Sequence, residues 1–357
     1  MVTTEITEME EYENPIEAYG LEDLTLPPIN RTAAKAAAEM TGKDEIRFLV
    51  NAFYQMQGDR IRTNNQIRSL KERSKDSYVI EWFSAYRQQA EDTLAKVLTY
   101  YVEGQELGRW LNSILGIGPL ISAGLMAYID MDKAQYVGNI WRYAGLDPTH
   151  EWLGKEKSTK LVKEMVSGSK PTLEEVTNIA VSLNRKADSL WRGAQDRKKG
   201  VETGKGVTTD SLIKALAKRP YNADLKTLCY KISDQLCIRQ INNPKNFYAP
   251  LFLEYKAKQQ KQNDEGKFAD IAEKKIGTVG KSTKAGQAYA QGRLSDGEIQ
   301  MRSRRWLVKL FLSHYHHVAY TLKFGENPPK PYAFAHLGHG NVVSPPNWDE
   351  ETGIIVP

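Results

Sequence analysis

Apolar side chains recur every three or four residues through most of the chain, which is the period of an amphipathic helix. The first long stretch of this kind covers residues 44–73, and the second covers 79–103. We expect these two helices to form an antiparallel hairpin or one arm of a coiled-coil dimer. Further helical patterns lie over 171–190, 211–218, 225–237, 244–255 and 298–322.

Three stretches lack this period. Residues 149–168 are rich in lysine and predict a loop, and residues 196–206 predict a flexible basic linker. Residues 256–298 contain few large apolar side chains, so we expect a mobile loop over a polyanion or a disordered insertion. No internal repeat is visible.

The helical patterns predict an all-α protein with a coiled-coil arm, a helix-hairpin-helix and a helical C-terminal domain. The changes in composition along the chain suggest six segments. These are an acidic disordered leader with room for one short helix (1–43), a coiled-coil helical hairpin (44–105), a helix-hairpin-helix (106–150), a basic helical insertion (151–217), a helical C-terminal domain (218–335) and an extended tail (336–357).

The helix-hairpin-helix prediction rests on the sequence from Trp110 to Ile129, where two apolar helical patterns are separated by Gly116, Ile117 and Gly118. Glycine permits the positive φ angles of a tight turn, and Pro119 suits the first position of the second helix. The free N–H groups at that helix start would bind phosphate, and they would read no base sequence. A glycine turn between packed helices can also be purely structural.

The sequence LGIGPLISAGLMAYI, followed by WRYAGLDP at 141–148, resembles the C-terminal transposase domain of the bridge-RNA-guided insertion-sequence transposases (the IS-one-ten class). The sequence at 218–228 (KRPYNADLKTL), the sequence at 243–248 (NPKNFY) and the closing helix are similar to later elements of that family. Leu115 departs from the family, which usually has proline there. A coiled coil precedes the hairpin in the family and helps it to dimerise.

The resemblance also implies a catalytic apparatus, and we expect it to be missing here. The family cuts DNA with four metal-binding carboxylates of an N-terminal nuclease-like domain and with a serine in a Ser-Gly pair just after Gly-Leu-x-Pro. Residues 1–43 are too few for such a domain, and Leu153 precedes Gly154 after Pro148. Ser167 and Ser169 are the remaining candidates for the nucleophile, although a loop and a helix cap explain them more simply.

Composition adds a charge asymmetry to this picture. Residues 1–30 contain eight acidic and no basic side chains, so the remainder carries a formal charge of +13, although the whole chain has only +5. A basic body suits a polyanionic partner, and the leader is either a competitor for that surface or a solvated tail. No run of eighteen apolar residues and no secretory signal is present, so we expect a cytoplasmic protein that does not contact a membrane.

We expect no metal site and no cofactor, with Mg²⁺ required only if the chain is catalytic. Four histidines present an alternative, since their imidazoles could together bind zinc, but a helix end that is polar or faces phosphate explains them better. They are His314, His317, His336 and His339. The two cysteines, Cys229 and Cys237, suit buried thiols in a reducing compartment.

The leading functional hypothesis is a non-catalytic nucleic-acid-binding protein, with DNA as the expected ligand, RNA as the other possibility and a homodimer formed through 44–105. Its binding residues would be Gly116, Ile117, Gly118, Arg302, Arg304, Arg305 and Lys309. An active strand transferase or nuclease, with a displaced serine or a domain supplied by a partner, is the second hypothesis. A structural assembly protein on the same scaffold is the third.

Overall fold

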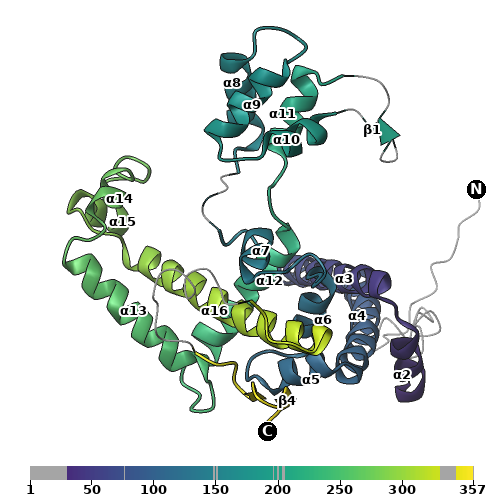
Figure 1. Cartoon of the computed structure of the whole chain (residues 1–357). Coiled ribbons are helices and arrows are strands. Elements are labelled where there is room, and N and C mark those ends of the chain that lie inside the picture. Colours follow the sequence, from purple (N-terminus) through teal and green to yellow (C-terminus); the bar gives the residue numbers. More distant parts are fainter. Residues whose placement is uncertain are drawn as a thin grey trace, which may run out of the picture. The chain divides into compact units, whose positions relative to one another are not determined.

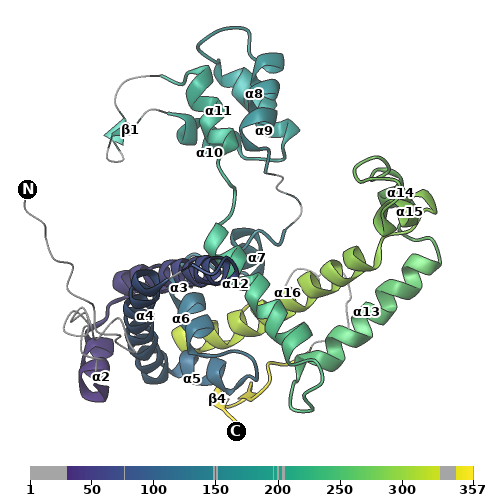
Figure 2. The same cartoon turned by 180° about the vertical axis from the view of Figure 1, so that it is seen from behind.

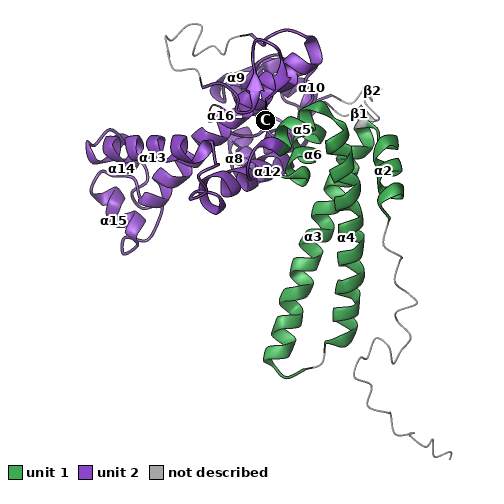
Figure 3. Cartoon of the chain, turned by 90° about the horizontal axis from the view of Figure 1, so that it is seen from below, with its two compact units in different colours: residues 1–112, 118–128 green, residues 113–117, 129–357 purple. Residues whose placement is uncertain are grey.

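The computed structural model describes residues 30–75, 77–147, 149, 152–195, 197–198, 201–202, 206–329 and 343–356. It confirms the all-α prediction, because the described strands are only two short antiparallel hairpins of two residues per strand. The chain divides into two compact units (Figure 3), residues 1–112 with 118–128 and residues 113–117 with 129–357. None of the described helices combines the length and the apolar character that a membrane crossing requires.

Unit 1 contains the long helical hairpin that the sequence predicts. Its helices are α2 (Arg31–Met40), α3 (Lys43–Glu72), α4 (Tyr78–Gly104), α5 (Glu106–Ser113, whose last residue counts with unit 2) and α6 (Pro119–Tyr128). α3 and α4 lie side by side and form an arm (Figure 3). The helix of the leader is α2, which packs on α4 through Ala34, Ala38 and Val97.

The base of the arm is apolar. The buried side chains of α3 are Ile46, Val50 and Phe53, at spacings of three and four residues, and those of α4 include Leu98 and Val102, four residues apart, and Val97, which contacts α2. Tyr128 of α6 donates its hydroxyl hydrogen to Asn51 Oδ1 at 2.6 Å, so α6 is also joined to α3. The apolar period of the sequence therefore predicts this half of the arm correctly.

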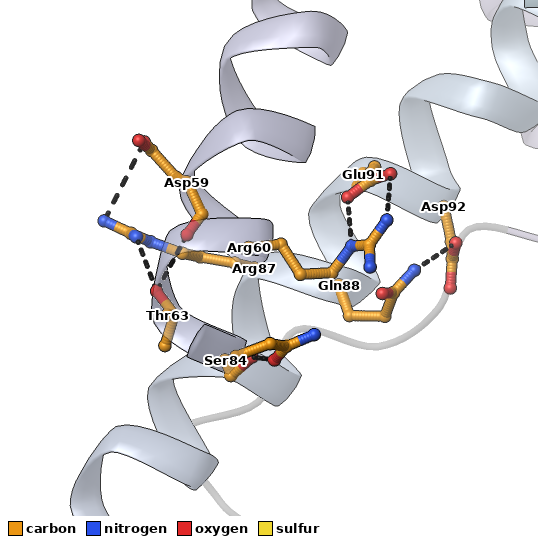
Figure 4. A network of polar contacts seen from close by, with 9 residues as sticks. Asp59, Arg60, Thr63, Ser84, Arg87, Gln88, Glu91 and Asp92 are labelled. Atoms are coloured by element: carbon orange, nitrogen blue, oxygen red, sulfur yellow. Dashed lines mark hydrogen bonds and ion pairs between the residues drawn. The ribbon is translucent and has the colours of Figure 1, made fainter. Parts of the chain in front are cut away.

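Farther along the arm, polar pairs replace the apolar contacts between α3 and α4 (Figure 4). Arg60 donates from Nε to Glu91 Oε2 at 2.7 Å and from a terminal nitrogen to Oε1 at 3.1 Å. The hydrogen bond with Glu91 raises the pKa of Arg60. Only 5 % of the Glu91 side chain is exposed, so the pair fixes the register of the two helices. Neighbouring contacts join Ser84 to Asn64, Arg87 to Thr63 and Arg87 to Asp59.

Arg60→Ala is expected to lower the free energy of unfolding by about 1–3 kcal/mol, because Glu91 would stay buried without its cation. Urea unfolding followed by far-UV circular dichroism measures the change. Arg62→Ala is the matched control, since 77 % of the Arg62 side chain is exposed in its pair with Asp59. This control should change stability by no more than about 0.5 kcal/mol. Equal losses in the two variants would contradict the structural role of the Arg60–Glu91 pair.

Unit 2 contains the remaining helices and the two strand hairpins (Figures 1 and 2). The elements up to residue 217 are α7 (Val137–Tyr143), α8 (Gly154–Met165), α9 (Leu173–Ser182), α10 (Ala187–Ala194), β1 (Arg197–Lys198), β2 (Val201–Glu202) and α11 (Thr209–Ala217). The later elements are α12 (Ala223–Asp234), the π-helix η2 (Gln235–Arg239), α13 (Tyr248–Asp264), α14 (Ala269–Glu273), α15 (Lys284–Ala290), α16 (Asp296–Phe324), β3 (Trp348–Asp349) and β4 (Ile354–Ile355).

The predicted loop over 149–168 is wrong, because α8 forms there. Lysines cover its exposed side and obscure the period, while Ser158 and Val162 lie on the buried side. α8 to α11 share a core of small aliphatic side chains, among them Val162, Val176, Ile179, Leu190, Leu212 and Leu216. Thr208 caps the start of α11, since its Oγ1 accepts a hydrogen bond from the Ser211 N–H at 3.2 Å.

The prediction of a mobile or disordered segment over 256–298 is also wrong. α13 continues to Asp264, and α14, α15 and the start of α16 enclose a small core of Phe268, Ala272, Tyr289, Leu294 and Ile299. The buried Asn263 holds this core with two hydrogen bonds, to the Leu294 carbonyl at 3.0 Å and from the Leu294 N–H at 2.8 Å. This core is therefore stabilised partly by buried hydrogen bonds of a polar residue, which leave no apolar period in the sequence.

Candidate nucleic-acid interface

Helices α5 and α6 are joined by a turn at Gly116 with φ of 90°, as the glycine pattern predicts. The Ile117 N–H donates to the Ile114 carbonyl at 3.0 Å and closes the turn. Asn347 donates to both the carbonyl and the hydroxyl of Ser113, at 3.1 and 3.0 Å, and so ties the end of α5 to the C-terminal segment.

The three glycine-turn residues differ in accessibility. A Cβ on Gly116 would lie 3.4 Å from Gln235 and 3.6 Å from Leu236, so Gly116 faces η2 and the chain around it. Ile117 is buried, with 2 % of its surface exposed. Gly118 is exposed, and a Cβ there would meet no atom within 4 Å. Of the three, Gly118 alone presents open space to a ligand.

The start of α6 supplies hydrogen-bond donors at this open position. Its first backbone bond runs from the Ser122 N–H to the Gly118 carbonyl at 3.0 Å. The N–H groups that precede Ser122 therefore have no acceptor within the helix. Ser122 Oγ lies 3.0 Å from Asn112 Oδ1 and 3.1 Å from the Gly118 carbonyl oxygen, which holds the helix start against α5.

In unit 2, the structure brings together two segments that carry the sequence resemblance, 141–147 and 218–228. The Asn222 N–H donates to the Tyr143 carbonyl at 2.8 Å, and its side-chain amide donates to the Tyr143 hydroxyl at 2.9 Å. Gly145 has φ of 66°, and a Cβ there would lie 2.8 Å from the Tyr221 ring. Glycine at 145 thus serves both the backbone angle and the close packing of Tyr221.

α7 is also fixed to α16. Trp141 donates from Nε1 to the Lys309 carbonyl at 3.1 Å, and Lys309 Nζ lies 5.3 Å from the centre of the Trp141 ring. Burial lowers the pKa of Lys309, whereas the negative charge of Asp147 opposes this shift. Lys309 is thus committed to its contact with the Trp141 ring.

The four basic residues predicted on the closing helix do not all lie on one face. Arg302, Arg305 and Lys309 stand at positions i, i+3 and i+7 and share a stripe of α16. Arg304 is only 7 % exposed; it donates to Ser233 Oγ at 3.0 Å and to the Tyr230 carbonyl at 3.4 Å. The burial of Arg304 makes it a link between α16 and α12.

A cavity of about 560 Å³ opens beside Gly145, Leu146, α12 and α16. Lys226 and Arg305 are exposed cations in its lining, and among the described residues neither is paired with an acid. Lys226 lies 4.1 Å from the centre of the Tyr221 ring. The sequence alone did not identify Lys226, because no local pattern shows which side of α12 faces α16.

Ser167 and Ser169, the candidate nucleophiles, lie on the exposed loop between α8 and α9. The Ser167 N–H donates to Glu175 at 3.0 Å, and the Ser169 carbonyl accepts from the Thr209 N–H at 3.1 Å. Hydrogen bonds from the backbone of Thr172 and Ser167 hold the pKa of Glu175 below its usual value, which makes Glu175 a weak base. Among the described residues, neither serine hydroxyl bonds to a histidine or lysine.

His314 of α16 serves the packing of unit 2. Both ring nitrogens of His314 are engaged, Nδ1 with the Tyr248 hydroxyl and Nε2 with the Val343 carbonyl, each at 2.8 Å. His336 and His339 lie outside the described residues. Within the described part of the chain, no three histidine, cysteine or acidic side chains gather closely enough to hold a metal ion.

Burial of His314 predicts a loss of stability in mild acid. Its pKa falls from 6.5 to about 4, chiefly through desolvation. The unfolded chain takes up this proton near pH 6.5 while the folded protein excludes it, so stability is full above pH 6.5. It falls by up to about 3 kcal/mol as the pH approaches 4. Urea unfolding at several pH values should give a flatter profile for His314→Gln, and an unchanged slope would contradict the assignment.

Comparison with known proteins identifies part of this region. Residues 108–192 match the model of the Transposase IS116/IS110/IS902 family. The match covers most of α5, all of α6 to α9 and most of α10. It therefore extends 44 residues beyond residue 148, where the resemblance seen in the first half of the sequence ends. No curated protein and no solved structure matched the chain. Residues 108–192 therefore form a transposase-like segment, similar to the transposases of this family.

Proposed function

We propose that this chain is a transposase-related nucleic-acid-binding protein that grips the phosphate backbone and does not itself cut it. DNA is the expected ligand, RNA is the alternative, and residues 44–105 would bring two copies together. Mg²⁺ would be needed only for catalysis. The assignment starts from the transposase-like segment 108–192, since proteins of this kind act on nucleic acid.

The observation that carries the proposal is the pair of exposed cations at the cavity beside Gly145 and Leu146, neither of which is paired with an acid in the part of the chain that the structure describes. Lys226 and Arg305 come from different helices, and both line this one concave surface. Surface cations usually stand among acids or on convex helix faces, whereas phosphate recognition needs cations that converge. The open start of α6 at Gly118 supplies a second, separate set of phosphate donors in unit 1.

A charge-matched pair of double variants tests the proposal. Lys226→Gln with Arg305→Gln removes the two exposed cations of the cavity, and Lys160→Gln with Lys261→Gln removes two exposed cations that pair with Glu164 and Glu265. Fluorescence anisotropy of labelled DNA is measured over a salt series. The first variant should reduce the magnitude of the slope of log affinity against log salt by about 1.4–1.8, since each of the two phosphate contacts contributes roughly 0.7–0.9. Equal effects of both variants would contradict a localised site.

The non-catalytic part of the proposal has its own test. Supercoiled plasmid is incubated with the protein and Mg²⁺, and nicking is measured by gel electrophoresis. We expect no nicking, because the described surroundings of Ser167 and Ser169 contain no strong base. Nicking by the wild type that Ser167→Ala or Ser169→Ala abolishes would instead establish the strand-transferase or nuclease hypothesis.

A further inference from the structure

An exposed aromatic ring lies in the same cavity as the two cations. Tyr230 is 54 % exposed, which is unusual for a large aromatic side chain on a helix that buries Leu228, Cys229 and Ile232. Tyr230 stands four residues after Lys226, so both side chains project from the same face of α12. The ring and the ammonium group therefore face the cavity together.

The Tyr230 ring is held in place from one side. The guanidinium of Arg304 lies 4.6 Å from the ring centre. Arg304 is itself fixed by Ser233, by the Tyr230 carbonyl and by Asp234, whose Oδ1 lies 3.7 Å from its terminal nitrogen. A cation on one face of a ring leaves the other face as the contact surface, and fixing the ring reduces the entropy lost when a ligand stacks on it.

The remaining lining suits a flat, weakly polar group next to an anion. Leu146, Met301 and Val308 provide apolar surface, and Met301 is 40 % exposed. The one acid in the lining, Glu298, bonds to Lys275 and accepts a hydrogen bond from the Tyr289 hydroxyl at 3.0 Å, so its charge is already compensated. A volume of about 560 Å³ also lies within the range of small-ligand sites, roughly 300–1,000 Å³.

From these contacts we infer that the cavity binds an unpaired nucleotide, with its base stacked on Tyr230 and its phosphates beside Lys226 and Arg305. The inference rests on the proposed function and specifies the form of nucleic acid that this site recognises. A base within a duplex has both faces covered by its neighbours and cannot stack on the ring. Stacking on an aromatic ring accepts any base, so the site does not read sequence.

Abasic strands separate stacking from phosphate binding. The probes are labelled single strands of about 12 nucleotides: oligothymidine, the same backbone without bases, oligouridine, and a blunt duplex of equal length. Anisotropy titrations at one low salt concentration give the affinity of the full chain for each probe. Oligothymidine and oligouridine show whether the unpaired nucleotide belongs to DNA or RNA, which share the chemistry of base and phosphate.

Three variants test whether the nucleotide base stacks on the Tyr230 ring. Tyr230→Ala should weaken binding of the preferred single strand about tenfold and leave the abasic strand unaffected. Tyr230→Trp should restore the affinity, because it restores the stacking surface. Tyr136→Ala is the matched control, since Tyr136 is 50 % exposed in the same unit but does not line the cavity. Arg304 keeps its bonds to Ser233 and to the backbone of residue 230 in these variants, and thermal melts verify folding.

The outcomes distinguish this inference from the proposed function. Equal affinity for abasic and base-bearing strands, or a preference for duplex that Tyr230→Ala leaves unchanged, would overturn the inference while salt-dependent binding still supported the proposed function. Absence of binding to every probe by the folded protein would overturn both. A loss in Tyr230→Ala that is confined to base-bearing strands and is reversed by Tyr230→Trp would establish the stacking site.

Discussion

Gly118→Glu is expected to weaken binding of duplex DNA by about tenfold at roughly 0.1 M salt, because it places a carboxylate where a phosphate would approach the start of α6. The substitution should leave the fold intact, since a Cβ at Gly118 meets no atom within 4 Å. Gly116 is the poorer choice for this test, because its φ of 90° strains any other residue. Anisotropy titration of labelled duplex measures the change in affinity.

Two controls isolate the charge at Gly118. Gly118→Ala adds a methyl group without charge and should bind as the wild type does. Gly58→Glu adds the same charge to α3, where a Cβ also meets no atom within 4 Å. If Gly118→Glu and Gly58→Glu weaken binding equally, the loss of affinity comes from the change in net charge, and the start of α6 does not contact phosphate.

Gly145→Ala should lower the free energy of unfolding by about 2–3 kcal/mol, through a left-handed backbone angle and a collision with an aromatic ring. The φ of Gly145 is 66°, and the added Cβ would lie 2.8 Å from Tyr221. Tyr221 directly precedes Asn222, which bonds to Tyr143, so the junction between 141–147 and 218–228 should loosen. Urea unfolding of the full chain measures the loss.

Gly138→Ala is the control for this effect. Gly138 lies in α7 and does not have a positive φ, and a Cβ added there would meet no atom within 4 Å. Alanine there should leave stability unchanged or raise it by up to about 1 kcal/mol, because it restricts the unfolded chain. A loss in Gly145→Ala no greater than the change in Gly138→Ala would show that Tyr221 does not constrain residue 145.

Sequence reasoning works well where one physical signal dominates. The long apolar stripes predict α3 and α16 to within two residues at each end, since burial of one face decides the period. The turn at Gly116 follows from the same logic, because few residues other than glycine tolerate its backbone angle. The transposase-like character of 108–192 was also visible in the residues themselves.

The sequence-based predictions fail where the structure depends on buried polar contacts or on the packing of distant helices. The core around Phe268 depends on buried hydrogen bonds of Asn263, and a single polar residue gives no periodic signal. Arg304 looks like its neighbour Arg305 in the sequence, yet one is buried against α12 and the other is exposed. Lys226 and Tyr230 line a cavity only because α12 packs on α16, and no local sequence pattern shows this tertiary contact.

The most direct test of the account is the affinity of the wild-type protein for labelled duplex DNA, single-stranded DNA and structured RNA across a salt series. If the protein grips the phosphate backbone, the logarithm of its affinity should fall linearly with the logarithm of the salt concentration, as expected when cations on the protein displace the counterions of phosphate. Absence of binding to all three ligands at low salt, by protein that circular dichroism shows to be folded, would contradict the account and favour an assembly role for the scaffold.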